Sequence, residues 1–272
     1  MTRHRKMRIL VIGASGMLGS AVCQVLPDAR GVSRRAGNFD IDADLDPLVQ
    51  GYDWIVNAVG VTKPMAQRDD LYRVNTQFPR ALANAAERSG ARVIQIATDG
   101  VFSGARGSYK ESDPHDATDD YGRSKSLGEV QSPAVLHLRC SIIGPEPHEP
   151  RYLLEWLRRQ PQSAIVPGFT NHLWNGITTL HFARILTGIV RGVDVPPVQH
   201  VIPAGVITKA NLLRELARAY GRTDLRIEDV EAPEAIDRTL ITERPDVNAA
   251  LWRAAGYHHP PAIPQMIDEL AH

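Results

Sequence analysis

The sequence predicts an α/β fold, a doubly wound parallel sheet with a small C-terminal lobe. Two observations carry this prediction. In the first half of the chain short apolar runs alternate with longer amphipathic ones, and after Ser141 this alternation stops. Strands that alternate with helices form a parallel sheet covered by helices on both faces. Such a sheet binds its ligands at the carboxyl ends of its strands, so functional residues are expected there.

Five apolar runs have the length and composition of strands. These predicted strands are residues 8–12, 29–33, 54–59, 92–97 and 135–140. Amphipathic patterns between them predict helices at residues 17–26, 71–89 and 121–130. In the second of these helices one stripe is formed by Val74, Phe78, Leu82 and Ala85, the spacing of a helix packed on a core. The order of elements is typical of a Rossmann-type domain.

The second half of the chain differs in pattern. Prolines cluster in GPEPHEP at residues 144–150, and separate helical patterns follow at residues 153–159, 180–191 and 209–220. We therefore expect residues 1–143 to form the sheet domain, completed by parts of 175–202. Residues 144–272 are expected to form mainly a smaller lobe over the strand ends.

The composition argues against several classes of binding partner. The 272 residues carry 31 basic and 31 acidic side chains, so no net charge attracts nucleic acid or an anionic membrane. No apolar run has the length that crosses a bilayer, and the basic start MTRHRKM leads into a short strand, so a cytoplasmic protein is expected. Neither Cys23 nor Cys140 belongs to a CxxC pair and the histidines lack ligand spacing, so no catalytic metal is expected.

Three glycines at three-residue intervals follow the first strand, in the stretch RILVIGASGMLGSAV. Gly13 permits a tight turn, Gly16 lets a pyrophosphate approach the backbone, and Gly19 lets the helix pack on the sheet. Further donors to a phosphate at the helix start are Ser15, Met17 and Leu18. A glycine turn between strand and helix often holds no ligand, but its place after the first strand favours a bound dinucleotide.

The end of the second strand indicates which dinucleotide is bound. Many NAD sites place a carboxylate here to hold the ribose 2′-OH, whereas this chain has Ser33, Arg34 and Arg35. Because a guanidinium favours a 2′-phosphate, NADPH is the expected cofactor, with NADH as the second choice. The competing interpretation is a solvated basic turn. From topology alone, further cofactor contacts are expected at Asp40, Ile41, Ala58, Val59 and Gly60.

The stretch YGRSK carries the predicted chemistry. Tyr121 and Lys125 lie four residues apart at the start of a helix, so the phenol and the ammonium share one face, where both are also expected to contact the cofactor. A free Tyr has a pKa of about 10, and a neighbouring cation favours the phenolate. Tyr121 is then expected to protonate an oxygen as hydride reaches its carbon.

The residue that follows the strand at 92–97 completes the predicted catalytic group, and the next one is a candidate substrate contact. The hydroxyl of Thr98 should emerge at the carboxyl end of this strand and donate to the same substrate oxygen. Asp99 is expected to bind substrate hydroxyls, although a carboxylate here can equally cap a local turn.

Candidate substrate contacts in the second half come from GFTNHLWNG, residues 168–176. Aromatic and amide side chains in one loop are the composition of a sugar or base pocket. Trp174 can stack on a ring and Asn171 can hydrogen-bond to hydroxyls, unless such residues only anchor the loop to the core. Arg238 and Arg244 can meet a diphosphate, but among 26 arginines a single one is usually solvated or ion-paired.

Together these motifs resemble a known family. The motifs GASGMLG, TDGVFSG at 98–104, G-x-Y-x-E at 107–111 and YGRSKSLGE at 121–129 are similar to the extended short-chain dehydrogenase/reductases, and within them to the dTDP-4-dehydrorhamnose reductase group. The resemblance implies an NAD(P)-binding domain, a substrate-binding lobe and reduction of the 4-keto group of a nucleotide-activated deoxysugar. It also implies Thr98, Tyr121 and Lys125 as catalytic residues, and relatives often form homodimers.

Two departures from the family pattern bear on the substrate. The family segment commonly reads TDYVF, whereas this chain has Gly100, and an aromatic common after the strand ending in RTS is missing from the SII that follows Cys140. Two other functions stay open. One is an epimerase with tightly held NAD, against which the arginine pair argues. The other is a non-catalytic protein that keeps the cofactor fold, as the regulatory β subunit of methionine adenosyltransferase does within this family.

Overall fold

A six-stranded parallel sheet forms the centre of the molecule. The structure is a computed structural model that describes residues 7–62, 67–148 and 150–272. The strand order is β10-β5-β4-β3-β1-β2, and every neighbouring pair is parallel. The strands are β1 (Ile9–Ile12), β2 (Arg30–Val32), β3 (Trp54–Asn57), β4 (Arg92–Ala97), β5 (Val135–Arg139) and β10 (Val198–His200). The predicted α/β class is confirmed, and all five predicted strands are present.

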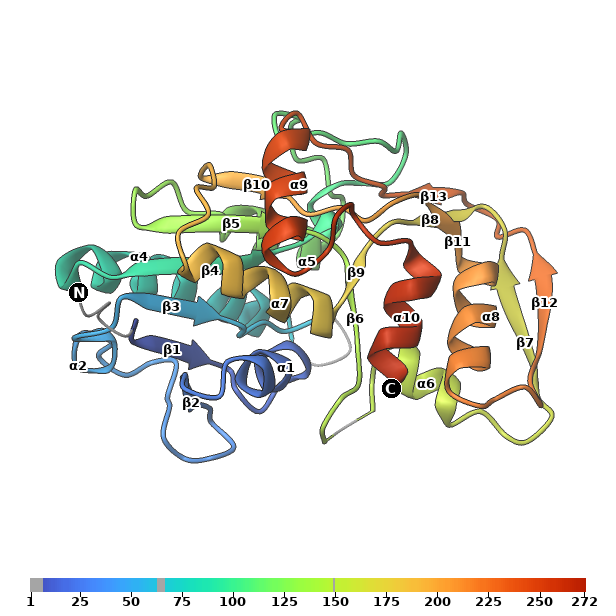
Figure 1. The fold of residues 1–272 in the computed structure, drawn as a ribbon, viewed down its shortest axis with the longest axis horizontal. Helices are drawn as coiled ribbons and strands as arrows, with labels where there is room; N and C mark the ends of the chain where they lie inside the picture. Colours follow the sequence, from blue (N-terminus) through green and yellow to red (C-terminus); the bar gives the residue numbers. More distant parts are fainter. Residues whose placement is uncertain (1–6, 63–66, 149) are drawn as a thin grey trace.

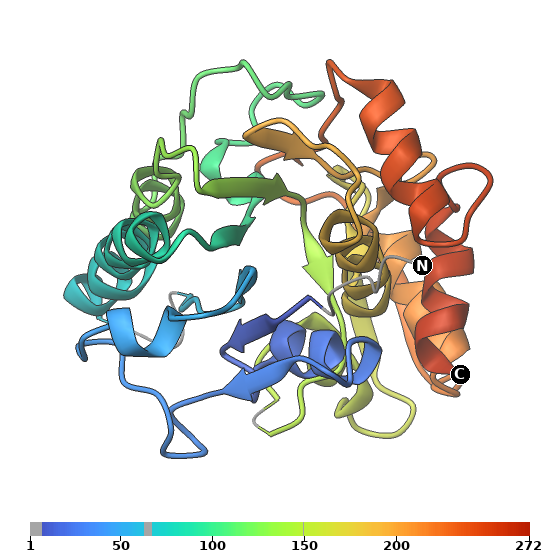
Figure 2. The same cartoon turned by 60° about the vertical axis from the view of Figure 1, so that its left-hand side comes forward.

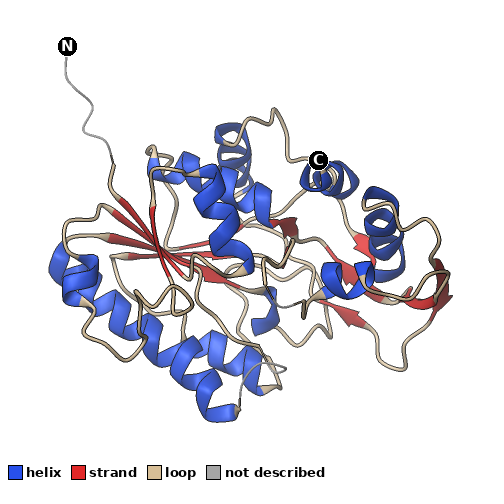
Figure 3. Cartoon of the chain, turned by 90° about the horizontal axis from the view of Figure 1, so that it is seen from below, coloured by secondary structure: helices blue, strands red, loops and turns tan. Residues whose placement is uncertain are grey.

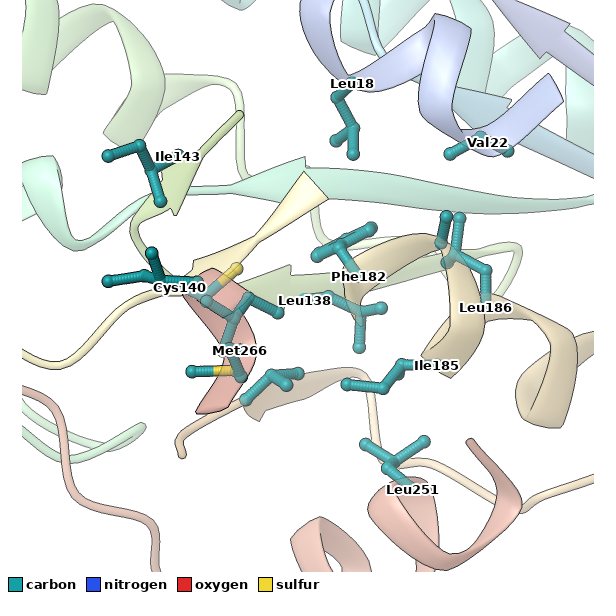
Figure 4. Close-up of a cluster of buried hydrophobic side chains, with 14 of the residues drawn as sticks. Leu18, Val22, Leu138, Cys140, Ile143, Phe182, Ile185, Leu186, Leu251 and Met266 are labelled. Carbon is teal, nitrogen blue, oxygen red and sulfur yellow. The ribbon is translucent and has the colours of Figure 1, made fainter. Parts of the chain in front are cut away.

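Helices cover both faces of this sheet (Figure 3). Successive residues of a strand point to opposite faces, and Leu10 and Val11 of β1 accordingly belong to two different apolar clusters. One cluster includes α1 (Met17–Val25) and α7 (Thr179–Val190), as Figure 4 shows for Leu18 and Phe182. The other includes α4 (Phe78–Ser89) and α2 (Asp46–Val49). Because both faces are covered, β1 and β3 are buried along their whole length instead of alternating between buried and exposed residues.

The predicted helix at residues 71–89 is three segments. These are α3 (Arg68–Tyr72), a π-helical turn η2 (Arg73–Gln77) and α4. The turn directs Asn75 and Thr76 inward, where Thr76 Oγ1 donates to the carbonyl of Ser124 at 2.7 Å. Asn75 Nδ2 donates to the hydroxyl of Ser124 at 3.1 Å. The π turn therefore fastens this helix to α5 (Asp120–Leu127), a feature that the apolar stripe alone does not reveal.

The second half of the chain builds a smaller lobe beside the carboxyl ends of the sheet (Figure 1). Its helices are α6 (Leu153–Arg158), α8 (Lys209–Ala219) and α10 (Ile263–Ala271). One small sheet has the order β11-β8-β13, formed by Ile207–Thr208, His172–Trp174 and Ile236–Asp237. A second pairs β7 (Ile165–Phe169) with β12 (Arg226–Val230), and a third pairs β6 (Ile142–Ile143) with β9 (Ile177–Thr178).

The chain passes between the two parts more than once. After the first lobe segments it returns to the sheet as α7 and β10, then forms β11, α8 and the rest of the lobe. The last helices, α9 (Pro245–Ala254) and α10, pack beside α7 on one side of the molecule (Figure 2). Of the helices in the described ranges, none has the length and apolar character needed to span a bilayer.

Candidate functional site

A cavity of about 870 Å³ lies where the strands end, between the sheet and the lobe. Its volume falls within the usual range of small-molecule sites. The sheet side contributes the glycine turn after β1, the ends of β3 and β4, and α5. The lobe side contributes β8 and the first turn of α8. The position at the carboxyl ends is the one that a parallel sheet favours for ligands.

The glycine turn has the geometry of a phosphate site. Gly13 has a φ of +88°, and a Cβ on Gly19 would lie 2.2 Å from the carbonyl oxygen of Gly13. Gly16 is the N-cap of α1 and provides no side-chain cap, so the first N–H groups of the helix remain available at the cavity wall. Ser15, Met17 and Leu18 line the same wall. These residues fit a dinucleotide, because a helix N-terminus with a glycine turn favours a pyrophosphate.

The turn after β2 brings its two arginines to the cavity. The hydroxyl of Ser33 accepts from the N–H of Ala36 at 3.2 Å, which holds the turn while Arg34 and Arg35 extend to the cavity rim. Ile41 lines the cavity as predicted, and so does Phe39, which the sequence analysis missed.

Asp40 is not brought to the cavity. Its carboxylate accepts from the N–H of Asp42 at 3.0 Å. The predicted contacts at the end of β3 do line the cavity, namely Ala58, Val59 and Gly60.

The three predicted catalytic residues meet at the cavity wall. Thr98 follows β4, and its hydroxyl accepts from the N–H of Gly100 at 3.0 Å and donates to Asp99 Oδ1 at 3.1 Å. The phenol of Tyr121 is buried beside Thr98, and the Thr98 hydroxyl acts to lower the phenol's pKa. One turn along α5, the ammonium of Lys125 donates to the carbonyl of Ile96 at 3.0 Å. Strand β4 and helix α5 thus position the group.

The electrostatics correct one expectation. Burial raises the pKa of Tyr121 to about 12, so the net shift is opposite to the lowering that the sequence predicted. Burial also lowers the pKa of Lys125 to about 8. Both shifts have the same cause, because a site that excludes water disfavours the charged form of either group. At neutral pH the site therefore holds a protonated phenol next to a mostly protonated amine.

Asp99 combines the two roles considered for it. It lines the cavity, and it also begins the 3₁₀ turn η3 (Asp99–Val101). Burial raises its pKa, while the charge of Arg238 acts in the opposite direction. Asp99 is therefore a carboxyl group held in a poorly hydrated wall, between Thr98 and an arginine from the lobe.

Gly100 explains how Tyr121 fits beside Thr98. Gly100 is buried, and a Cβ on it would lie 3.1 Å from Cε1 of Tyr121 and 3.3 Å from Oγ1 of Thr98. With a side chain here, one of these two groups would have to shift by a few tenths of an ångström. The departure noted in the sequence thus lies against the predicted catalytic group.

Residues 168–176, predicted as a loop, form the end of β7, a turn and β8, and they divide between site and scaffold. Trp174 lines the cavity, and its indole N–H donates to the hydroxyl of Ser141 at 2.9 Å. Asn171 is not brought to the cavity, because its amide exchanges hydrogen bonds of 2.7 and 3.0 Å with the backbone of Ala232. Asn171 therefore anchors the loop, the alternative considered for it.

The lobe adds cavity residues that sequence reasoning did not select. Tyr152 and Lys209 line the cavity, as does Arg238, whereas Arg244 does not. The hydroxyl of Tyr152 lies 3.3 Å from Oγ1 of Thr62, so α6 meets the loop after β3 across the cavity. The only sequence signal for Lys209 was its place at the start of a predicted helix, in a lobe expected over the strand ends.

Comparisons with known proteins agree with this architecture. The family model described as RmlD substrate binding domain matches residues 7–143. A dTDP-4-dehydrorhamnose reductase of Streptomyces griseus is 34% identical over 94% of this chain and 90% of its own length. That of Mycobacterium tuberculosis strain H37Rv is 32% identical over 46% of this chain and 45% of its own length. The chain thus spans about half the length of several curated relatives and nearly all of the Streptomyces protein.

A solved structure is similar over almost the whole chain. It is the dTDP-4-dehydrorhamnose reductase of Bacillus anthracis strain Ames in complex with NADP. The TM-score is 0.81 at 18% identity, and the match covers 98% of this chain and 99% of that one. This likeness shows that the sheet and the lobe belong to one shared fold.

Proposed function

Since this chain belongs to the RmlD substrate binding domain family, we propose that it is an NADPH-dependent reductase acting on the 4-keto group of a nucleotide-activated deoxysugar. The observation that carries the proposal is the meeting of Thr98, Tyr121 and Lys125 at a cavity wall beside a phosphate-binding glycine turn. The identity with the Streptomyces reductase over nearly the full length supports the substrate class.

The cofactor would be held by the sheet domain. The first turn of α1 would bind its pyrophosphate, and Arg34 with Arg35 would bind a 2′-phosphate. The NADP complex of the Bacillus anthracis reductase supports this choice of cofactor, with NADH as the second choice. When bound, the cofactor supplies hydride to the carbonyl carbon of the sugar.

The proton would come from Tyr121. As negative charge develops on the carbonyl oxygen, the phenol gives its proton to that oxygen. The hydroxyl of Thr98, which donates to Asp99 before substrate binds, would rotate to donate its hydrogen bond to the same oxygen. A pKa of about 12 keeps the phenol protonated before the reaction, which is the form that a general acid needs. Lys125, one turn away on α5, supplies the positive charge that stabilises the phenolate left behind.

The test follows reduced nicotinamide by absorbance. Purified protein is given NADPH or NADH with a panel of nucleotide 4-keto-6-deoxysugars, and Tyr121→Phe serves as the matched variant. We expect oxidation of NADPH that depends on one sugar and is lost in the variant, while the variant still binds NADPH. Tight cofactor binding without turnover on any sugar would refute the reductase and favour a regulatory role. Copurified oxidised cofactor would favour the epimerase.

A further inference from the structure

A buried arginine that does not line the cavity joins several segments that build it. Arg139 is the last residue of β5, and its guanidinium lies over the ring of Phe102, 5.3 Å from the ring centroid. Its Nε and Nη2 donate to the carboxylate of Glu129, just after α5. Its other hydrogen bonds within the described residues go to the imidazoles of His115 and His200.

The geometry of these contacts fixes the state of both imidazoles. Nη2 of Arg139 lies 2.9 Å from Nε2 of His115, and Nη1 lies 2.7 Å from Nε2 of His200. Because a guanidinium only donates, each Nε2 bears a lone pair, so each imidazole is neutral and carries its proton on Nδ1. The partners of the two Nδ1 atoms accept that proton, since they are the hydroxyl of Ser126 and the carbonyl of Ile241, both at 2.7 Å.

Three segments that contribute to the cavity wall meet at this arginine. The segment after β4 carries Phe102, whose ring lies edge-on to both imidazoles. Helix α5, which carries the proposed acid, is held through Ser126 and Glu129. The segment after β13, which contributes Arg238 to the cavity, is held through the carbonyl of Ile241. The relative placement of the three segments therefore depends on one guanidinium and two imidazole acceptors.

We propose that Arg139 is a positioning residue for the reduction, and that neutral His115 and His200 are the acceptors through which it holds the site segments together. As far as turnover is concerned, this inference rests on the proposed function. A proton on either imidazole would remove the acceptor and place two cations side by side. On His115 the new N–H would also lie 3.7 Å from Oε2 of Glu129 and compete with Arg139 for that carboxylate.

The surroundings favour the neutral imidazoles. Burial lowers the pKa of His115 and lowers that of His200 to about 4, and the charge of Arg139 acts in the same direction. Neighbouring carboxylates act in the opposite direction. The charged and titratable groups that face the two imidazoles are Arg139, Glu129, Glu111, Asp116 and His137. Proton uptake is therefore expected only below the ordinary imidazole pKa of about 6.5.

Substitutions that separate the acceptor from the proton test this inference. Gln offers a neutral amide oxygen and takes up no proton, whereas Leu offers no acceptor. His115 and His200 are each replaced by Gln and by Leu in the full chain, and a further variant carries both Gln substitutions. The matched control is His258→Gln, because His258 is exposed and is not a hydrogen-bond partner of Arg139. Per site that binds NADPH, kcat and KM are measured between about pH 5 and pH 8, where an imidazole titrates.

We expect each Leu variant to lower kcat about 10- to 100-fold with little change in KM, because a small misplacement of catalytic groups slows the reaction. The Gln variants should restore most of kcat, and the variant with both Gln substitutions should lose the decline of kcat that the wild type shows in acid. Nitrogen NMR shifts should show a protonated Nδ1 and an unprotonated Nε2 at both positions. A purely structural role would lower Tm and leave the pH profile unchanged.

Three results would overturn the inference. They are wild-type kcat in both Leu variants, an unchanged acid decline in the variant with both Gln substitutions, and an imidazole at either position that is charged or protonated on Nε2 at neutral pH. The last two results decide the inference even where the Leu variants do not fold.

The outcome is separate from that of the reductase. An active reductase with wild-type kcat in both Leu variants refutes only the positioning role. If no sugar is turned over, the reductase is refuted, and amide hydrogen exchange after β4 and in α5 decides whether the imidazoles hold these segments. Faster exchange in the Leu variants than in the Gln variants supports the inference, and equal exchange overturns it.

Discussion

Glu129→Gln should lower the free energy of unfolding and narrow the pH range of the proposed activity. Glu129 follows α5, and its two carboxylate oxygens accept from Nε and Nη2 of Arg139 at 3.1 and 2.6 Å. The two side chains are only 8% and 2% exposed. Arg139 also contacts His115 and His200 at 2.9 and 2.7 Å. The ion pair therefore joins α5 to β5 and, through His200, to β10.

The size of the expected loss in the free energy of unfolding follows from the burial of the ion pair. Removing one partner of a buried ion pair costs about 3–5 kcal/mol, because the other charge is left in a poorly hydrated place. The amide of Gln still accepts one hydrogen bond, so we expect a loss of about 3 kcal/mol in the free energy of unfolding, near the lower end of that range. Urea denaturation followed by circular dichroism measures this loss.

A matched control separates burial from pairing. Asp46 accepts two hydrogen bonds from Nε of Arg88 and a third from its Nη2, but these side chains are 47% and 60% exposed. Asp46→Asn should leave the denaturation midpoint close to the wild-type value, because water screens an exposed pair.

The same substitution tests the link between Glu129 and Lys125. Burial lowers the pKa of Lys125 to about 8, and the charge of Glu129 partly opposes that shift. Glu129→Gln should therefore lower the pKa of Lys125 further, so the alkaline limb of the pH–rate profile moves to lower pH. An unchanged midpoint together with an unchanged pH–rate profile would refute the reasoning.

The remaining predictions concern the site and its surroundings. Tyr121→Phe should lower kcat about 10²- to 10⁴-fold with NADPH affinity unchanged, in steady-state assays and titrations; equal kcat would remove Tyr121 as the acid. Gly100→Ala would place a Cβ 3.1 Å from the phenol ring and should lower kcat, up to about 10²-fold, with the denaturation midpoint as its control. Arg34→Ala with Arg35→Ala should cut NADPH affinity about 10- to 100-fold and spare NADH, and equal losses would contradict a 2′-phosphate contact. Burial lowers the pKa of His181 to about 4, so as the pH falls the imidazole takes up a proton in the unfolded chain before it does in the folded one. The free energy of unfolding should therefore decrease as the pH drops from about 6.5 towards 4. His181→Asn should flatten this decrease, measured by urea denaturation at each pH.

Short-range sequence patterns predicted those features of the structure that residues close together in the chain determine. The inner strands β1, β3, β4 and β5 were found because a strand covered on both faces is mostly apolar along its length, whereas the edge strand β2 was placed from its position after the first helix. The pairing of Tyr121 with Lys125 was found because a spacing of four residues fixes a shared helix face. The sixth strand, β10, was missed as a strand because only its pairing with β5 distinguishes it from the loop around it.

Several site features could not be found this way. The π turn that fastens Asn75 to α5 does not alter the apolar stripe around it. Asn171 and Trp174 lie three residues apart in one stretch of aromatic and amide residues, yet Asn171 anchors the turn before β8 and Trp174 lines the cavity. The difference comes from contact with Ala232, which is distant in sequence.

The sequence by itself determined the glycine turn, the identity of the chemical groups and the order of strands and helices. These depend on backbone freedom, residue type and short-range spacing. The tertiary structure alone decided which charges face the cavity and which protonation states they hold. Desolvation raises the pKa of Tyr121 and lowers that of Lys209, and it depends on segments that pack together from distant parts of the chain.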